Sequence, residues 1–275
     1  MRKLVVTADD LGLDPATNAE ITDLARRERV TATTLMPVAP GARDAVRRVT
    51  AAGLAPPRLH VTLTSARELP PWRPVAADVG SLTEADGVFP VTPRRVAALG
   101  EAADVARELA AQWRWMRTGG LPPSGLDSHS GVLYQHTGLG AALRFCAEHS
   151  LAFRLPARLQ PVVRTTWRGR LRRRYDEAVA RARDLGVRLP ETVLTPWLPG
   201  RLLLSYDQLR AHVLAQVRAV PEGVSELIMH PAAPSTARTL APAEGRKRVW
   251  ELRLLRDPTF LAELRRERIA LAPSW

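Results

Sequence analysis

A short apolar run near the start of the chain ends in two neighbouring carboxylates, and this stretch constrains the fold more than any other. Leu4-Val5-Val6-Thr7-Ala8 has the composition of a buried strand, and Asp9 and Asp10 follow it directly. In α/β proteins the loops at the carboxyl ends of parallel strands carry the ligand sites. Because two adjacent acids repel each other, a cation or a shared proton would stabilise the pair. The pair is therefore a candidate metal ligand and general base, and capping of the following helix is the alternative.

The rest of the chain alternates between strand and helix patterns joined by short turns. Such alternation is typical of a parallel sheet with crossover helices. Further strands are predicted at residues 30–36, 59–64, 125–128, 152–156, 224–231 and 269–271. Helices are predicted at about 15–28, 41–53, 92–117, 139–149, 170–185, 206–217, 245–255 and 258–267.

Length and composition are equally compatible with one large α/β domain and with two small ones, and we expect a single domain over residues 1–275. The sequence is 45% hydrophobic and has no long uncharged apolar run, so we expect no transmembrane helix. Asp9 and Asp10 interrupt the first apolar stretch too early for a signal peptide. Cys146 is the single cysteine, which excludes an internal disulfide and a cysteine-based zinc cluster. A cytoplasmic location is expected.

The net charge of +12 raises the question of a nucleic-acid partner. The basic residues are almost all arginine and are spread among acids, apart from a cluster between Arg164 and Arg174. That cluster could meet phosphates or an acidic membrane surface, but no aromatic-interleaved binding motif accompanies it. We therefore expect no nucleic-acid partner and leave a homodimer open.

Two segments lack a clear element pattern. Residues 65–92 form a long irregular stretch with several prolines, which is typical of a lid or binding loop. Residues 157–205 are the least regular part and are interpreted as a variable basic insertion.

Three histidines lie at or near the ends of predicted strands, as the acid pair does. They are His60, His129 and His230. In a barrel such ends converge on one face, so that two imidazoles and one carboxylate could hold a divalent metal with open positions. A spare carboxylate could then take a proton from water, and a spare histidine could give one to a leaving group. A lone histidine at a strand end is also compatible with a purely structural role.

At these residues the chain resembles the YdjC-like carbohydrate deacetylases. The likeness covers nearly the full length. Its motifs are Thr7-Ala8-Asp9-Asp10-Leu11-Gly12-Leu13, Leu59-His60-Val61-Thr62-Leu63-Thr64, Leu126-Asp127-Ser128-His129 and Leu227-Ile228-Met229-His230-Pro231.

The resemblance implies a distorted (β/α) TIM-like barrel with its active site at the carboxyl ends of the strands. It implies removal of acetyl from an N-acetylated carbohydrate or glycoconjugate. By motif match, Asp10, His60 and His129 would bind one divalent metal, Asp9 would be the base and His230 the acid. Zinc is the first expectation, with magnesium, manganese, cobalt and nickel also compatible.

Four further residues are predicted to contact the sugar: Trp72, Arg73, Ser130 and Arg154. For Trp72 and Arg73 the alternative is that they pin the long loop. Many relatives have a histidine-rich run after the Asp-Ser-His motif, and here the run is His129-Ser130-Gly131-Val132-Leu133, so the identity of the sugar stays open. Hydrolysis of another small amide or ester, and a catalytically silent sugar-binding protein, are the alternative functions.

Overall fold

The computed structural model describes residues 1–134, 136–160 and 168–275, with only the backbone given for residues 136 and 137. The strands of this described part form one sheet in the order β5-β4-β3-β2-β1-β7-β6, with β8 paired to the start of β1. Every pairing is parallel. The strands are β1 (Arg2–Leu11), β2 (Ala32–Leu35), β3 (Arg58–Val61), β4 (Gly125–Ser128), β5 (Ala152–Phe153), β6 (Val193–Leu194), β7 (Gly223–Met229) and β8 (Ile269–Leu271).

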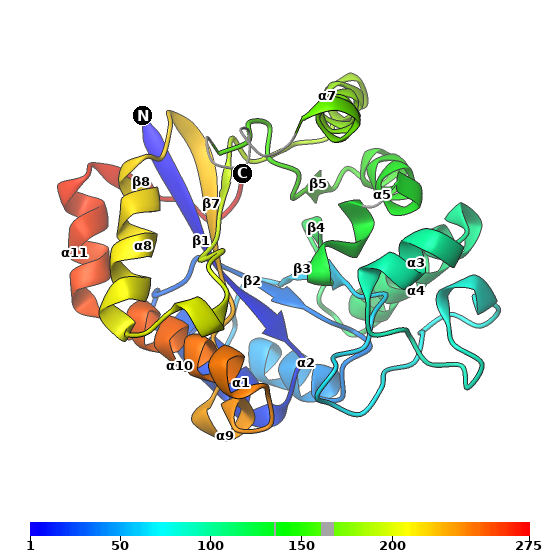
Figure 1. Cartoon of the computed structure of the whole chain (residues 1–275), viewed down its shortest axis with the longest axis horizontal. Helices are drawn as coiled ribbons and strands as arrows, with labels where there is room; N and C mark the ends of the chain where they lie inside the picture. The colour runs from blue at the N-terminus through cyan, green and yellow to red at the C-terminus, as the bar shows by residue number, and fades with distance from the viewer. Residues whose placement is uncertain (135, 161–167) are drawn as a thin grey trace.

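The sheet curls, and its two edges come together through irregular backbone contacts. The amide of Phe153 in β5 donates to the carbonyl of Arg188 at 3.0 Å, and that of Ala157 donates to Pro190 at 2.8 Å. These carbonyls lie just ahead of β6, so β5 and the chain leading into β6 are neighbours. The helices lie around the outside of the curled sheet (Figure 1). The predicted distorted TIM-like barrel is thereby confirmed.

The helices and helical turns outside the sheet mostly follow the predicted positions. The helices are α1 (Pro15–Arg26), α2 (Ala42–Ala51), α3 (Pro93–Leu99), α4 (Ala102–Thr118), α5 (His136–Glu148), α7 (Gly169–Asp184), α8 (Tyr206–Arg218), α9 (Pro234–Ala237), α10 (Pro242–Arg256) and α11 (Pro258–Arg266). The described residues also form three 3-10 turns: η1 (Gly80–Leu82), η2 (His129–Tyr134) and η3 (Gly200–Leu202).

One predicted helix is wrong in its extent. Residues 92–117 form two helices, because Gly100 takes an extended conformation with φ −66° and ψ 124°. A Cβ at this glycine would lie 2.5 Å from the carbonyl oxygen of Val96, so the chain approaches the preceding turn more closely than another residue allows. The short helix α9 and the strand β6 were not predicted, since elements of a few residues carry almost no periodicity.

Side chains in the strands alternate between the helix layer and the barrel interior, as a period of two requires. In β1, Leu4, Val6 and Ala8 belong to the large core cluster, whereas Val5 belongs to a small one with Ala152 and Trp275. Above this small cluster, toward the carboxyl ends, the barrel interior is filled by charged residues: Arg58 of β3, Glu226 of β7 and Arg154, which directly follows β5. The charged layer is thus buried directly beneath the predicted active-site face.

The long segment at residues 65–92 packs on the barrel instead of extending from it. Trp72, Leu82 and Phe89 are each at most 4% exposed. The hydroxyl of Ser65 accepts from the amide of Trp72 at 2.9 Å and donates to the carbonyl of Phe89 at 2.8 Å. These contacts tie the two ends of the segment together, and its function as a lid stays a prediction.

Part of the basic cluster predicted between Arg164 and Arg174 lies outside the described residues, which resume at residue 168. In the part of the chain that is described, no helix is long and apolar enough to cross a bilayer.

The single cysteine is expected to be chemically silent in the folded protein. Cys146 is fully buried in α5, and burial raises the pKa of its thiol. Because the thiolate is the reactive form, we expect no labelling by a disulfide reagent at pH 8 until the chain is denatured. One thiol should then react per chain. Labelling of the native protein at the rate of a free thiol would contradict this placement.

Candidate metal centre

The end of β1 and the turn that follows it bring the two aspartates into the barrel mouth, and another residue caps the next helix. Asp14 is the N-cap of α1, where its carboxylate accepts from the amides of Ala16 and Thr17 at 2.9 and 3.0 Å. The capping alternative for Asp9 and Asp10 is therefore excluded. Both are about 1% exposed, so their carboxylates are buried and need polar partners.

This turn depends on an unusual backbone and on one buried amide. Asp10 has φ 74° and Gly12 has φ 101°, in the region that favours glycine. A Cβ at Gly12 would lie 2.8 Å from the carbonyl oxygen of Met36. The side chain of Asn18 accepts from the amide of Gly12 at 2.7 Å and donates to the carbonyl of Gly41 at 2.9 Å.

Replacing Asn18 by alanine is expected to destabilise the protein by about 1–3 kcal/mol, because it leaves the amide of Gly12 buried without a partner, whereas the carbonyl of Gly41 still accepts from the amide of Ala45. Thermal or urea unfolding measures the change. Thr22, one turn further along α1, offers a matched control, since its hydroxyl bonds only to carbonyls of its own helix. Equal stability of the Asn18→Ala and Thr22→Ala variants would contradict the role given to Asn18.

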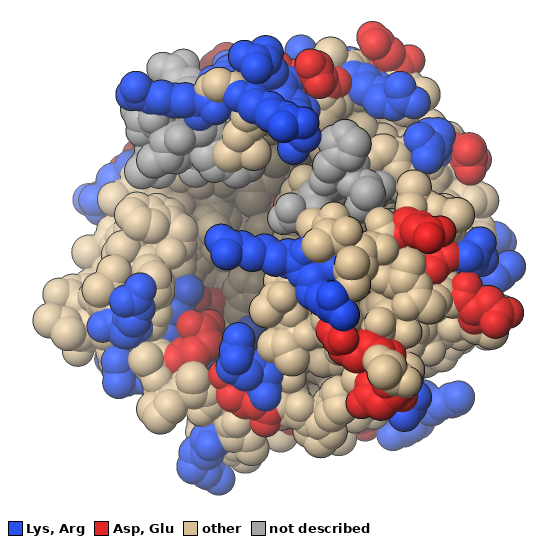
Figure 2. Space-filling model, turned by 45° about the vertical axis from the view of Figure 1, so that its right-hand side comes forward, with Lys and Arg blue, Asp and Glu red and all other residues tan. Residues whose placement is uncertain are grey.

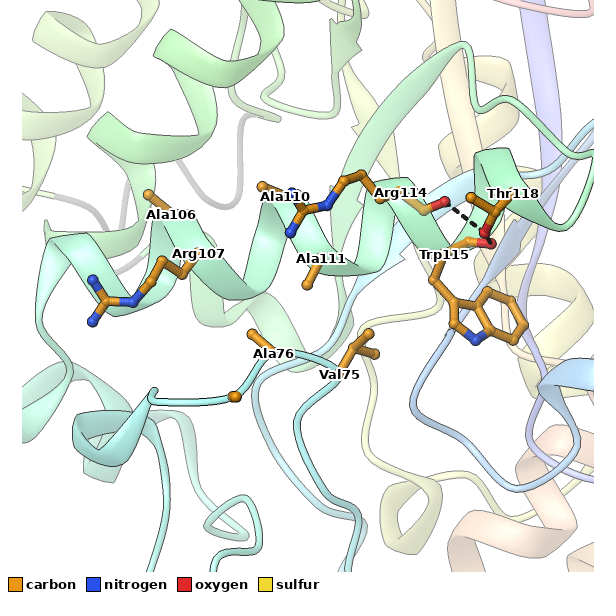
Figure 3. A pocket seen from close by; sticks show the side chains of 10 residues that line it. Val75, Ala76, Ala106, Arg107, Ala110, Ala111, Arg114, Trp115 and Thr118 are labelled. Carbon is orange, nitrogen blue, oxygen red and sulfur yellow. Dashed lines mark hydrogen bonds between the residues drawn. The ribbon is translucent and has the colours of Figure 1, made fainter.

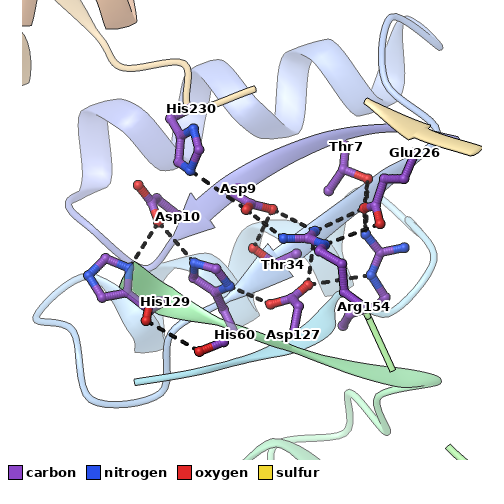
Figure 4. Close-up of polar contacts among 12 residues, drawn as sticks. Thr7, Asp9, Asp10, Thr34, His60, Asp127, His129, Arg154, Glu226 and His230 are labelled. Carbon is purple, nitrogen blue, oxygen red and sulfur yellow. Dashed lines mark hydrogen bonds and ion pairs between the residues drawn. The ribbon is translucent and has the colours of Figure 1, made fainter. Parts of the chain in front are cut away.

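Two of the predicted metal ligands, both histidines, lie close to one carboxylate oxygen of the third, Asp10. Asp10 Oδ1 lies 3.3 Å from His60 Nε2 and 3.5 Å from His129 Nδ1 (Figure 4). The three ligand atoms all lie within 4.8 Å of one another. Asp10 Oδ1 is buried and accepts no hydrogen bond from any described residue, whereas Asp10 Oδ2 accepts from Arg248 at 2.6 Å. An unpaired carboxylate oxygen between two imidazole nitrogens is a donor set that fits a divalent cation.

The ring orientation of His60 is fixed by a carboxylate on the side away from Asp10. Its Nδ1 contacts Asp127 Oδ1, which leaves Nε2 facing Asp10. A carboxylate behind a ligating imidazole is the common arrangement in metal sites, where it sets the tautomer. Burial disfavours charge on His60, but the carboxylates of Asp127 and Asp9 outweigh it and raise the pKa of His60 to about 10. Burial lowers the pKa of His129, which favours the neutral form of this second imidazole.

Asp9 faces the same opening but is held by other groups. Arg154 donates to both of its oxygens, at 2.8 and 2.9 Å, and Thr34 donates to Oδ1 at 3.0 Å. Burial raises the pKa of Asp9, but the charges of Arg154 and His60 outweigh it and hold this pKa well below its usual range. Asp9 is therefore a fixed carboxylate beside the ligand set.

His230 stands across from Asp9 at the end of β7. Its Nε2 lies 3.8 Å from Asp9 Oδ2, and its Nδ1 lies 4.0 Å from the buried carboxylate of Glu251. The His230 side chain is 33% exposed, so it is reached from solvent while its backbone amide is bonded to Glu251. This is the placement expected of a group that exchanges protons with a bound molecule.

The other predicted contacts fall in different surroundings. The ring of Trp72 lies 5.8 Å from that of His129, and Ser130 follows His129 at an exposed position with φ 51°. Arg73 donates to the carbonyl of Asp86 at 3.0 Å, which is the loop-pinning alternative. Arg154 was predicted to contact the sugar, but it is 3% exposed and lies beneath Asp9 instead of in the opening, because acids from three strands surround it.

The buried charges beneath the site were not predicted from the sequence. Glu226 of β7 accepts from Arg154 at 2.9 and 3.1 Å, from Thr7 at 2.6 Å and from the indole of Trp275 at 2.7 Å. Arg58 also contacts Glu226 and lies over the ring of Trp275. The signal that could have found them is the alternation within each strand. Arg58 stands two positions before His60, and Glu226 stands four positions before His230, so both side chains face the same interior.

Another hollow on the molecule carries none of this chemistry. It has a volume of about 820 Å³ and lies along α4, between Arg107, Trp115 and the loop at Val75 (Figure 3). None of the residues that line it is a histidine, a cysteine or an acid.

Comparison with known proteins shows the family to which the chain belongs. The sequence profile of the YdjC-like protein family matches residues 3–266. The chain belongs to this family. A carbohydrate deacetylase of Geobacillus stearothermophilus is 30% identical over 266 residues, which are 96% of this chain and 93% of the relative.

A solved structure from Enterococcus faecalis V583, of a protein to which cleavage of cellobiose phosphate is ascribed, has the same fold. It superposes with a TM-score of 0.73 at 23% identity and covers 98% of this chain and 97% of its own. The family predicted from four short motifs is therefore confirmed.

Proposed function

We propose that this YdjC-like chain is a metal-dependent deacetylase that removes the acetyl group from an N-acetylated carbohydrate or glycoconjugate. The observation that carries the proposal is Asp10 Oδ1, a buried oxygen without a hydrogen-bond donor among the described residues. It lies between Nε2 of His60 and Nδ1 of His129. The carbohydrate deacetylase among its relatives, similar over 96% of this chain, supports the reaction class.

Asp10, His60 and His129 would hold one divalent cation, and zinc suits a site of two imidazoles and one carboxylate. When bound, such a cation polarises an amide carbonyl and acidifies a water molecule. Arg248 holds the second oxygen of Asp10, so only Oδ1 is available as a ligand.

Asp9 and His230 divide the proton transfers between them. Asp9 would take the proton of the attacking water, because its carboxylate is ionised and fixed by Arg154 and Thr34. His230, on the other side of the opening, would give a proton to the departing amine of the sugar. The C–N bond of the acetamide breaks, and acetate and the free amine are released.

The first experiment measures bound metal and acetate release on the same protein samples. We expect about one equivalent of a transition metal in the purified protein and acetate release from N-acetylglucosamine oligomers. The His129→Ala variant should lose both, because it removes one of three ligands. His149→Ala is the matched control, since His149 packs against Trp113 and Phe145 away from the site.

The outcomes separate the alternatives. Metal without acetate release would favour another amide or ester substrate, or a silent sugar-binding protein. Absence of metal after reconstitution, with an unchanged fold, would overturn the metal site and return the histidines to a structural role.

A further inference from the structure

A large apolar cavity opens beside the candidate metal centre, and the proposed reaction at an N-acetyl group does not use it. Its volume is about 740 Å³, within the range of small-molecule sites in proteins. It lies between β5, α5, α7 and the ends of β6 and β7. The apolar side chains that form most of its wall include Leu139, Leu143, Leu155, Leu159, Leu171 and Ile228.

Two separate segments each place one residue in the candidate active site and one in the wall of this cavity, and a single arginine links the two sites. Turn η2 begins with His129 and ends with Tyr134, which lines the cavity. Ile228 lines it from β7, two residues before His230 and on the same face of the strand. Arg154 borders the cavity and also holds Asp9. The cavity therefore lies next to the site where the acetamide would react, with Arg154 between them.

The lining of the cavity is unsuited to a plain sugar chain. Sugar rings carry hydroxyl groups on all sides and would need polar partners when buried. Aromatic and aliphatic side chains dominate here instead, and two of them, Leu171 and Trp197, are each 49% exposed at the edge of the cavity. A large exposed leucine and tryptophan at the edge of an apolar hollow indicate a surface that is covered when an apolar ligand binds.

Two basic side chains at the cavity stand at its outer edge, whereas Arg154 is buried. Arg174 and Arg181 line it from α7, are exposed, and form no ion pair with another described residue. The face in Figure 2 is hollowed, and Lys and Arg side chains stand around the hollow. Apart from a few polar residues, the lining between these side chains is apolar.

We propose that the substrate is an N-acetyl glycoside with an apolar aglycone, and that this aglycone occupies the cavity while the acetamide lies at Asp10, His60 and His129. The proposal rests on the deacetylase function proposed above and names its substrate class. It requires that the sugar next to the aglycone carries the acetyl group, because the cavity adjoins the site directly.

Methyl and octyl β-glycosides of N-acetylglucosamine test the proposal on the metal-reconstituted protein, below the concentration at which the octyl compound forms micelles. Each methylene that leaves water contributes about a threefold to fourfold gain in affinity, so kcat/KM should be at least about tenfold higher for the octyl glycoside. The Leu171→Asp and Trp197→Ala variants should lose this preference and keep the rate on the methyl glycoside. Leu99→Asp is the matched control, at another leucine that is 48% exposed but does not line the cavity.

Each outcome decides one of the two proposals. Equal kcat/KM for both glycosides, or equal losses on both in the cavity variants, would overturn the apolar aglycone and leave the deacetylase function intact. No acetate from either glycoside would overturn the deacetylase function, and the substrate class would fall with it. Titration of tryptophan fluorescence with the octyl glycoside would then show separately whether the cavity takes an alkyl chain, as Trp197 lies in its wall.

Discussion

Replacing Asp9 by asparagine should leave the metal in place and lower kcat by about 10²- to 10⁴-fold, the usual contribution of a general base. Asparagine keeps the size of the side chain and one oxygen for Thr34 and Arg154, but it cannot accept a proton from water. The ligands Asp10, His60 and His129 are untouched, so the metal content should stay at that of the parent protein.

The loss should appear in kcat more than in KM, because a base acts on the transition state and not on the binding of the sugar. Metal content and the unfolding temperature of the same sample control for damage to the site. Asp10→Asn is the informative comparison. It changes the neighbouring acid, whose Oδ1 lies 3.3 and 3.5 Å from the two imidazoles, and should lose metal and activity together. Normal turnover of Asp9→Asn would assign the proton transfer to another group.

The fold and the grouping of Asp10, His60 and His129 followed from local features of the sequence. A β-branched run that ends in two acids, and three further strands with a histidine at or near their ends, already indicate the face on which the side chains meet. What decided the family was their order along the chain, since each motif is short. The acid pair could have capped the following helix or formed part of a site. Asp14 excludes the first interpretation, because it caps α1 itself.

The supporting residues could not be predicted in the same way. Arg154 contacts acids that are 72 and 145 residues away in the chain, and an arginine at a strand end has the same local pattern whether it faces a ligand or is buried among acids. Asp127 belongs to a matched motif, but only the register of β3 with β4 shows that it stands behind His60. Such roles depend on which strands are neighbours, which the sequence pattern does not contain.

The second large effect is expected from Arg154→Met. Arg154 contacts the carboxylates of Asp9, Asp127 and Glu226 in the barrel interior, where all four side chains are at most 3% exposed. Methionine fills a similar volume but leaves three buried acids facing one another. Removal of one partner from a buried ion pair costs about 3–5 kcal/mol, so the midpoint of thermal unfolding should fall by roughly 6–20 °C. Thermal unfolding at pH 7 measures the change.

A double variant separates lost charge compensation from lost packing. Glu226→Gln removes one negative charge from the same cluster while its amide can still bond to Thr7 and Trp275. If Arg154 compensates charge, then Arg154→Met combined with Glu226→Gln should be more stable than Arg154→Met alone, with a coupling of about 1–3 kcal/mol. Additive losses would instead assign the effect to packing. The distinction matters for catalysis, because the charge that compensates Glu226 also keeps the Asp9 carboxylate ionised and pointed at the opening. The double variant should therefore keep a low kcat even if its stability is recovered.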